Sequence, residues 1–131
     1  MAVNDLLGKE DSMHYNAVPG VVYTNPEVAG AGLTEAEAAA KGLDVTVLKL
    51  PMAYAGRFVA ENERGEGLCK VVIGKEDRKV LGVHMLGNPC SEMIHGACIA
   101  IEQGMTVEQL QRVIFPHPTV SEILRETVFT A

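Results

Sequence analysis

The sequence predicts an α+β fold: an antiparallel β-sheet with helices packed mainly on one face. Strand-like runs of β-branched residues fall mostly before residue 87, and helix-like segments dominate from there to the C-terminus. Two of the runs, 68–73 and 79–86, are separated by a polar segment of the length expected for a β-hairpin loop, which implies antiparallel pairing. The chain has no G-x-G-x-x-G sequence, no Walker-type loop and no internal repeat. Strands followed by a group of helices are typical of α+β domains.

The composition indicates one globular domain. The 131 residues can bury a sizeable core, and 47% hydrophobic residues with a mean hydropathy of +0.12 are ordinary globular values. The formal net charge is −6 and basic residues form no cluster, so neither nucleic acid nor an anionic membrane surface is expected as a partner. No apolar run approaches the roughly 20 residues of a membrane helix, and residues 1–9 do not resemble a signal peptide. We therefore expect a soluble, cytoplasmic chain.

The three cysteines, Cys69, Cys90 and Cys98, show neither an even count nor C-x-x-C spacing, so a disulfide framework is not expected. Cys98 and His95 are placed to share a helix face as a possible metal-binding pair. No third and fourth ligands are grouped nearby, and free cysteine commonly behaves as a small buried hydrophobe. We therefore expect no metal site.

The N-terminal segment combines a weakly apolar start with one predicted strand. Residues 2–16 contain a short apolar turn and then a polar stretch of mixed charge, which gives too little apolar surface to fold around. Val21–Thr24 lies between Pro-Gly and Asn-Pro pairs and is predicted to be a short strand. Gly30 and Gly32 are expected to keep the following segment an open loop.

The next part of the chain predicts a helix and another strand. Thr34 with Glu37 forms a capping box, which starts a helix that Gly42 ends. The run Asp44–Met52 alternates in the manner of a strand. Residues 53–61 are ambiguous, because their alanines favour a turn of helix and Gly56 weakens it.

Two helices are predicted after the hairpin. Asn88 is a suitable N-cap, Pro89 suits the first helical position, and apolar residues recur at helical spacing up to Gly104. This helix should be the best buried. Thr106 with Gln109 makes a second capping box, for a short helix that reaches about Arg112.

The C-terminal stretch 115–122, with the sequence FPHPTVSE, is the most distinctive part of the chain. Its two prolines fix the backbone on either side of His117, and a cis His117–Pro118 bond is compatible with the pattern. Thr119 is expected to be the N-cap of the last helix, with Glu122 closing a third capping box.

Two interpretations of this stretch remain open at the level of the residues. In the first, Glu122 only caps the helix and His117 is structural. In the second, the carboxylate hydrogen-bonds one ring nitrogen, which fixes the tautomer and raises the basicity of the imidazole, so the pair forms half of an acid–base site.

Several segments carry a family resemblance. His117-Pro118-Thr119 followed by Glu122 resembles the histidine motif of the flavin-dependent pyridine nucleotide-disulfide oxidoreductases, and residues 120–124 are closest to their dihydrolipoamide (dihydrolipoyl) dehydrogenase branch. Further segments match the C-terminal interface domain of that family, in the same order along the chain: Asn16–Pro19, Val21–Ala29, Gly32–Glu35, Gly82–Gly87, Glu92–Ile94 and Thr106–Leu110. The likeness extends from about residue 16 to residue 129.

The resemblance implies a domain division and a site. Residues 1–16 would be the remnant of a preceding domain with its linker, and residues 17–131 the interface (dimerisation) domain. His117 and Glu122 would be the catalytic base and its support, acting on the disulfide site of the partner subunit. His117 and Pro118 would also lie near the partner subunit's flavin. Phe115 departs from the pattern, because many dihydrolipoyl dehydrogenases carry a second histidine at this position.

The resemblance also implies cofactors and partners. The full-length enzyme would be a homodimer that uses FAD and NAD and oxidises the lipoyl domain of a 2-oxoacid dehydrogenase or glycine cleavage complex. No glycine-rich cofactor fingerprint and no redox cysteine pair occur in the 131 residues. We therefore expect this chain alone to bind no cofactor and to be inactive. The alternatives are a related reductase of glutathione, CoA-disulfide or metal ions, and a free-standing interaction module with a structural histidine.

Overall fold

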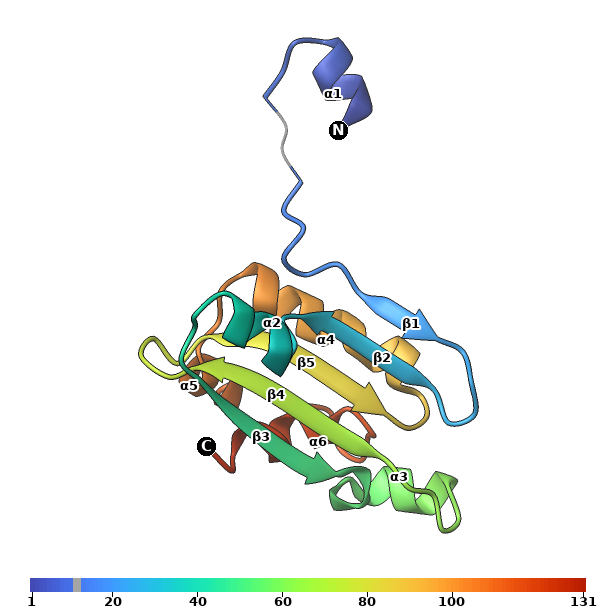
Figure 1. The fold of residues 1–131 in the computed structure, drawn as a ribbon. Helices are drawn as coiled ribbons and strands as arrows, with labels where there is room; N and C mark the ends of the chain where they lie inside the picture. The colour runs from blue at the N-terminus through green and yellow to red at the C-terminus, as the bar shows by residue number, and fades with distance from the viewer. Residues whose placement is uncertain (11–12) are drawn as a thin grey trace.

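The computed structural model describes residues 1–10 and 13–131 (Figure 1). Its strands are β1 (Gly20–Val22), β2 (Val28–Gly32), β3 (Val45–Pro51), β4 (Leu68–Gly74) and β5 (Val80–Leu86). Its helices are α1 (Ala2–Leu6), α2 (Glu35–Ala40), the 3₁₀ turn η1 (Met52–Tyr54), α3 (Gly56–Glu61), α4 (Cys90–Glu102), α5 (Val107–Gln111) and α6 (Glu122–Val128).

The described strands form one sheet in the order β1-β2-β5-β4-β3, and every neighbouring pair is antiparallel. Helix α4 packs on β2 and β5, and α6 packs on β3 and β4, so both cover the same face. The predicted α+β architecture is confirmed. The hairpin of β4 and β5 forms as expected, and residues 53–61 become the end of η1 and α3.

The main core lies between the sheet and these two helices because the strands alternate. Alternate residues such as Leu50, Val71 and Met85 are buried against Ile94 and Ala97 of α4 and Ile123 of α6. The opposite face carries a smaller layer under α2, where Val72 and Ala38 are fully buried. There Glu35 forms ion pairs with Lys70 and Lys49 across the strands.

The prediction that Gly30 and Gly32 lie in an open loop is wrong, because both belong to strand β2. The glycines are required by close packing. A Cβ atom on Gly30 would lie 2.6 Å from Nδ1 of His84, and one on Gly32 would overlap the carbonyl oxygen of Leu81. Gly32 also has a positive φ of 73°.

The predicted start of α4 is also wrong, because the helix begins at Cys90 with Pro89 as its N-cap. The Oδ1 atom of Asn88 instead accepts a hydrogen bond from the backbone N–H of Glu27 at 2.8 Å. The carboxylate of Glu27 in turn accepts the N–H of Ser91 at 2.9 Å and so satisfies one free amide of the first turn. These bonds join the β1–β2 loop to the start of α4.

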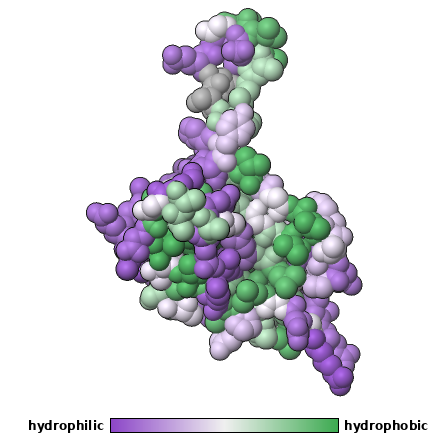
Figure 2. Space-filling view, in the orientation of Figure 1, coloured by the Kyte–Doolittle hydropathy of each residue, from purple (hydrophilic) through white to green (hydrophobic). Residues whose placement is uncertain are grey.

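The N-terminal segment extends away from the sheet, and α1 has no buried residue (Figure 1). Near the sheet, His14 Nδ1 lies 2.7 Å from Glu102 Oε1 of α4. On the face seen in Figure 2, hydrophobic residues gather on the β1 side. By register, four partly exposed residues form one row across β1, β2, β5 and β4: Val22, Val28, Leu86 and Leu68.

Candidate functional site

The stretch that contains His117 connects α5 to α6 and is anchored at both ends. Phe115 packs against the core before the histidine, and Val120, Ile123 and Leu124 are buried after it. The residues between these anchors, Pro116–Pro118, are exposed. The imidazole therefore lies on a short projecting turn whose two ends are fixed by apolar packing.

His117 and Glu122, the two predicted catalytic residues, are in contact. Nδ1 of His117 lies 2.9 Å from Oε1 of Glu122. The side chain of His117 is 81% exposed, whereas that of Glu122 is 17% exposed. The backbone N–H of Thr119 donates to the other carboxylate oxygen, Oε2, at 2.9 Å. The amide of Thr119, and then the imidazole, hold the pKa of Glu122 below its ordinary value.

The expected N-cap is wrong. Helix α6 begins at Glu122, its N-cap residue is Ser121, and no side chain caps it. The hydroxyl of Thr119 donates instead to the carbonyl oxygen of Pro116 at 2.8 Å. Only the carboxylate-to-amide half of the capping box is present, because the chain makes a further turn after Thr119 before it becomes helical.

This geometry defines what the imidazole can do. An ionised carboxylate only accepts hydrogen bonds, so its contact assigns the proton of a neutral ring to Nδ1. Nε2 is then the unprotonated nitrogen and is able to accept a proton. Glu122 would stabilise the positive charge that results. The arrangement is therefore suited to a general base whose substrate approaches from outside the domain.

The other histidines have different surroundings. Nε2 of His84 lies 3.0 Å from the carbonyl oxygen of Leu33, in a partly buried position that supports the crossing into α2. His14 also contacts a carboxylate, that of Glu102 in α4. The side chain of Glu102 is more exposed than that of Glu122. His95 lines the cavity described next.

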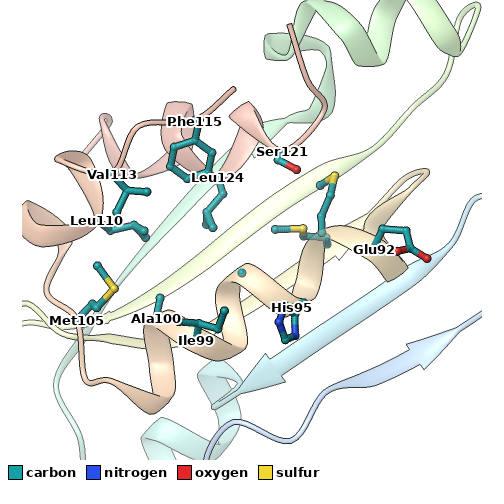
Figure 3. A pocket seen from close by; sticks show the side chains of 13 residues that line it. Glu92, His95, Ile99, Ala100, Met105, Leu110, Val113, Phe115, Ser121 and Leu124 are labelled. Atoms are coloured by element: carbon teal, nitrogen blue, oxygen red, sulfur yellow. The ribbon is translucent and has the colours of Figure 1, made fainter. Parts of the chain in front are cut away.

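An apolar cavity of about 340 Å³ lies beside the histidine stretch, between α4 and the segment that runs from residue 105 to α6 (Figure 3). Ile99 and Ala100 of α4 form one wall, and Leu110, Val113 and Phe115 form another (Figure 3). This cavity was not predicted from the sequence. The sequence feature that relates to the cavity is the helical spacing of apolar residues in α4, and the same spacing is expected of a helix that only packs on the sheet.

The cysteines are not placed as nucleophiles. Burial raises the pKa of Cys69 and of Cys90 to about 11, and it also raises that of the half-buried Cys98. Within residues 1–10 and 13–131, no three His, Cys, Asp or Glu side chains come together as a metal-binding group. In the same part of the chain, no helix is both long and apolar enough to cross a membrane.

Fold and site together describe an α+β domain that carries an exposed, carboxylate-paired histidine on the turn before its last helix. A sequence model of the family described as "Pyridine nucleotide-disulphide oxidoreductase, dimerisation domain" matches residues 18–128. The chain belongs to this family, as the resemblance implied.

Individual relatives agree with this membership. The chain is 42% identical over 124 residues to the mitochondrial dihydrolipoyl dehydrogenase of Pisum sativum, a match that covers 95% of this chain and 25% of the relative. It is 38% identical over 131 residues to the dihydrolipoyl dehydrogenase of Bacillus subtilis, covering 100% of this chain and 28% of the relative. The chain thus spans about a quarter of the length of these relatives.

A solved structure supports the fold. LpdA from Mycobacterium tuberculosis superposes with a TM-score of 0.88 at 23% identity, and the match covers 98% of this chain and 28% of that one. At this identity the likeness shows the fold alone.

Proposed function

We propose that this chain is the dimerisation domain of a flavin-dependent dihydrolipoyl dehydrogenase, and that His117, supported by Glu122, is the base in the oxidation of dihydrolipoamide. The 2.9 Å contact between His117 Nδ1 and Glu122 Oε1 carries this proposal, because it leaves Nε2 of an exposed ring ready to accept a proton. The identity with two dihydrolipoyl dehydrogenases supports the choice of substrate.

The proposed proton transfer runs from a thiol of the substrate to the imidazole of His117. An S–H group of dihydrolipoamide loses its proton to Nε2 of His117, so that one S–H bond breaks and one N–H bond forms. The thiolate, which is the nucleophilic form of sulfur, then attacks a disulfide carried by the part of the enzyme outside this domain, so that a mixed S–S bond forms while the enzyme's own S–S bond breaks and one of its sulfurs leaves as a thiolate. The second sulfur of dihydrolipoamide then attacks the mixed disulfide, which releases oxidised lipoamide and leaves both enzyme sulfurs reduced. Glu122 remains ionised and stabilises the imidazolium until the proton is returned.

The cofactors belong to the whole enzyme. FAD would take the electrons from the reduced enzyme sulfurs and NAD would carry them away. Among the described residues, the groups best suited to approach a flavin of the partner subunit are His117 and Pro118, because both are exposed on the projecting turn. The buried cysteines, with their raised pKa values, are unsuited to be the redox pair.

The partners follow from the same proposal. The enzyme would be a homodimer, because a dimerisation domain that presents its base outward needs a second subunit to complete the site. The dithiol would arrive on the lipoyl domain of a 2-oxoacid dehydrogenase or glycine cleavage complex. The 131-residue chain alone would have no oxidoreductase activity.

The test is a His117→Gln substitution in the full-length enzyme. Because a general base contributes about 10² to 10⁴ in rate, turnover of dihydrolipoamide should fall by about that factor. Reduction of an artificial acceptor such as ferricyanide by NADH should be unchanged, since that reaction needs no thiol deprotonation. His14→Gln is the matched control, because it removes another histidine paired with a carboxylate. Normal dihydrolipoamide turnover by the His117 variant would refute the assignment.

Phe115 is the observation that favours a second candidate substrate class, that of the related disulfide and metal-ion reductases. It replaces the additional histidine of many dihydrolipoyl dehydrogenases, and it packs against the core instead of joining the exposed turn. A related reductase of glutathione, CoA-disulfide or metal ions would tolerate this replacement. Measuring full-length turnover with dihydrolipoamide, glutathione disulfide and CoA disulfide side by side separates the two classes.

A further inference from the structure

We propose that Thr119 is a positioning residue for the His117–Glu122 pair, and that its hydroxyl holds the imidazole in the tautomer needed for catalysis. The functional part of this inference rests on the proposed function. The structural part concerns only the hydrogen bonds of this chain and can be tested without any activity.

Thr119 connects both sides of the histidine. Its hydroxyl donates to the carbonyl oxygen of Pro116, at 2.8 Å, and its N–H donates to Glu122 Oε2, at 2.9 Å. Glu122 Oε1 contacts His117 Nδ1, at 2.9 Å. These three bonds close a ring that runs from the residue before His117, through Thr119 and Glu122, and back to the imidazole.

The two complete capping boxes, at the starts of α2 and α5, use their threonine hydroxyl differently from Thr119. The pattern Thr-x-x-Glu/Gln precedes a helix at Thr34–Glu37 and Thr106–Gln109 as well as at Thr119–Glu122. It also occurs at Thr24–Glu27, where a strand follows and the Thr24 hydroxyl donates to the carbonyl oxygen of Pro26. At Thr34 and Thr106, the hydroxyl accepts the N–H of the third residue, at 3.2 and 3.3 Å, and forms a complete capping box. At Thr119 the hydroxyl faces the opposite way along the chain, towards Pro116.

This reversal links the residue before the histidine to the residue whose amide orients Glu122. In the first box, the hydroxyl and N–H of Thr34 both donate to Oε2 of Glu37, each at 2.8 Å. At Thr119 only the N–H donates to Glu122, because the hydroxyl is engaged by Pro116. The Thr119 amide orients the carboxylate through Oε2, and Oε1 is the oxygen that faces the imidazole. The ring that meets it must then present Nε2 outward.

The experiment compares Thr119→Val, Thr119→Ala and Thr119→Ser. Valine keeps the shape and loses the hydroxyl, alanine loses it without an added methyl group, and serine keeps it. Thr130→Val is the matched control, since the hydroxyl of Thr130 makes an equivalent 2.7 Å bond to the carbonyl of Thr127, at the far end of α6.

The first readout is the tautomer of His117 in the ¹⁵N-labelled 131-residue chain, measured by ¹⁵N–¹H correlation at about pH 8.5, well above the ordinary imidazole value of about 6.5. The wild type, Thr119→Ser and Thr130→Val should show Nδ1–H. Thr119→Val and Thr119→Ala should show the mixture typical of free histidine, in which Nε2–H predominates. The second readout is full-length activity, where a displaced base should lower kcat with dihydrolipoamide about tenfold to a hundredfold, and serine should restore it.

Each result is decisive. An unchanged tautomer in both Thr119→Val and Thr119→Ala would overturn the proposal, and so would loss of the Nδ1–H form in Thr119→Ser. Unfolding of both variants would also overturn it, because the hydroxyl would then serve stability and not position. If the tautomer shifts as expected but His117→Gln remains fully active, the positioning role stands and the proposed function fails.

Discussion

At the scale of single residues, the two carboxylate oxygens of Glu122 have different hydrogen-bond partners. One accepts the amide of Thr119 and the other contacts the imidazole. Both contacts keep the pKa of the carboxyl group below its ordinary value of 4.5, so the carboxylate is ionised at neutral pH. A lowered pKa also means that Glu122 stabilises the fold above about pH 4.5 and loses this contribution as the pH falls below that value.

We expect replacement of this carboxylate to shift the pH dependence of the activity of the full-length enzyme. Glutamine at position 122 can still accept the Thr119 amide, but it carries no charge to stabilise a protonated ring. The imidazole of Glu122→Gln should therefore lose its proton at a lower pH, and the acid limb of the pH–activity profile should move to lower pH. The rate on the plateau should fall less than in His117→Gln. An unmoved acid limb would reduce Glu122 to an acceptor for the Thr119 amide.

The sequence suggested that the side chains of His117 and Glu122 could meet, and the structure shows the contact, but the hydrogen bond from the Thr119 hydroxyl to Pro116 was not predicted. The pair is separated by only five positions, and prolines restrict the intervening backbone, so few geometries were available. The threonine hydroxyl had two possible partners, an amide ahead and a carbonyl behind. The choice depends on where α6 begins, and that is set by the burial of Val120, Ile123 and Leu124 against the rest of the core.

At the scale of elements, the β4–β5 hairpin and helices α2, α4, α5 and α6 were predictable from pattern, whereas β2 was not. Its sequence, Val-Ala-Gly-Ala-Gly, lacks the bulky alternation by which strands are recognised. The strand consists of small residues because neighbouring groups leave no space for larger side chains at its glycines. The ring of His84 lies where a side chain on Gly30 would be, and Gly32 pairs with Gly82. That information lies in other elements and cannot be read locally.

Two glycine substitutions test this close packing. A Cβ atom on Gly82 of β5 would overlap the carbonyl oxygen of Leu33, where the chain crosses from β2 to α2. Backbone cannot move aside easily, so Gly82→Ala should lower the free energy of unfolding by about 1–3 kcal/mol or more. Gly96 of α4 has open space around it, so Gly96→Ala should raise that free energy by up to about 1 kcal/mol. Urea unfolding measures both, and equal midpoints for the two variants would contradict this account.

At the scale of the whole molecule, a dimerisation domain should associate with itself. Stable interfaces bury about 1,200–2,000 Å², and apolar side chains on the surface of this chain are suited to such burial. Ile114, beside the cavity, is 94% exposed. Sedimentation equilibrium should therefore show self-association at micromolar concentration.

A pair of matched variants locates the association. Ile114→Lys should weaken it, whereas Leu6→Lys should not, since Leu6 is 86% exposed but lies outside the residues matched by the family model. A strictly monomeric wild-type chain at high concentration would contradict the expectation. Equal weakening by both variants would indicate nonspecific apolar contact.

The strand order also determines when the sheet can form during synthesis. Strand β2 is made early but pairs with β5, so the β1–β2 hairpin has an unpaired edge until Val80–Leu86 has left the ribosome. Unpaired edges recruit other chains most readily when they are rich in bulky, β-prone side chains. β2 offers mainly alanine and glycine at this stage. The same small residues that conceal this strand in the sequence therefore make the nascent hairpin a poor template for aggregation.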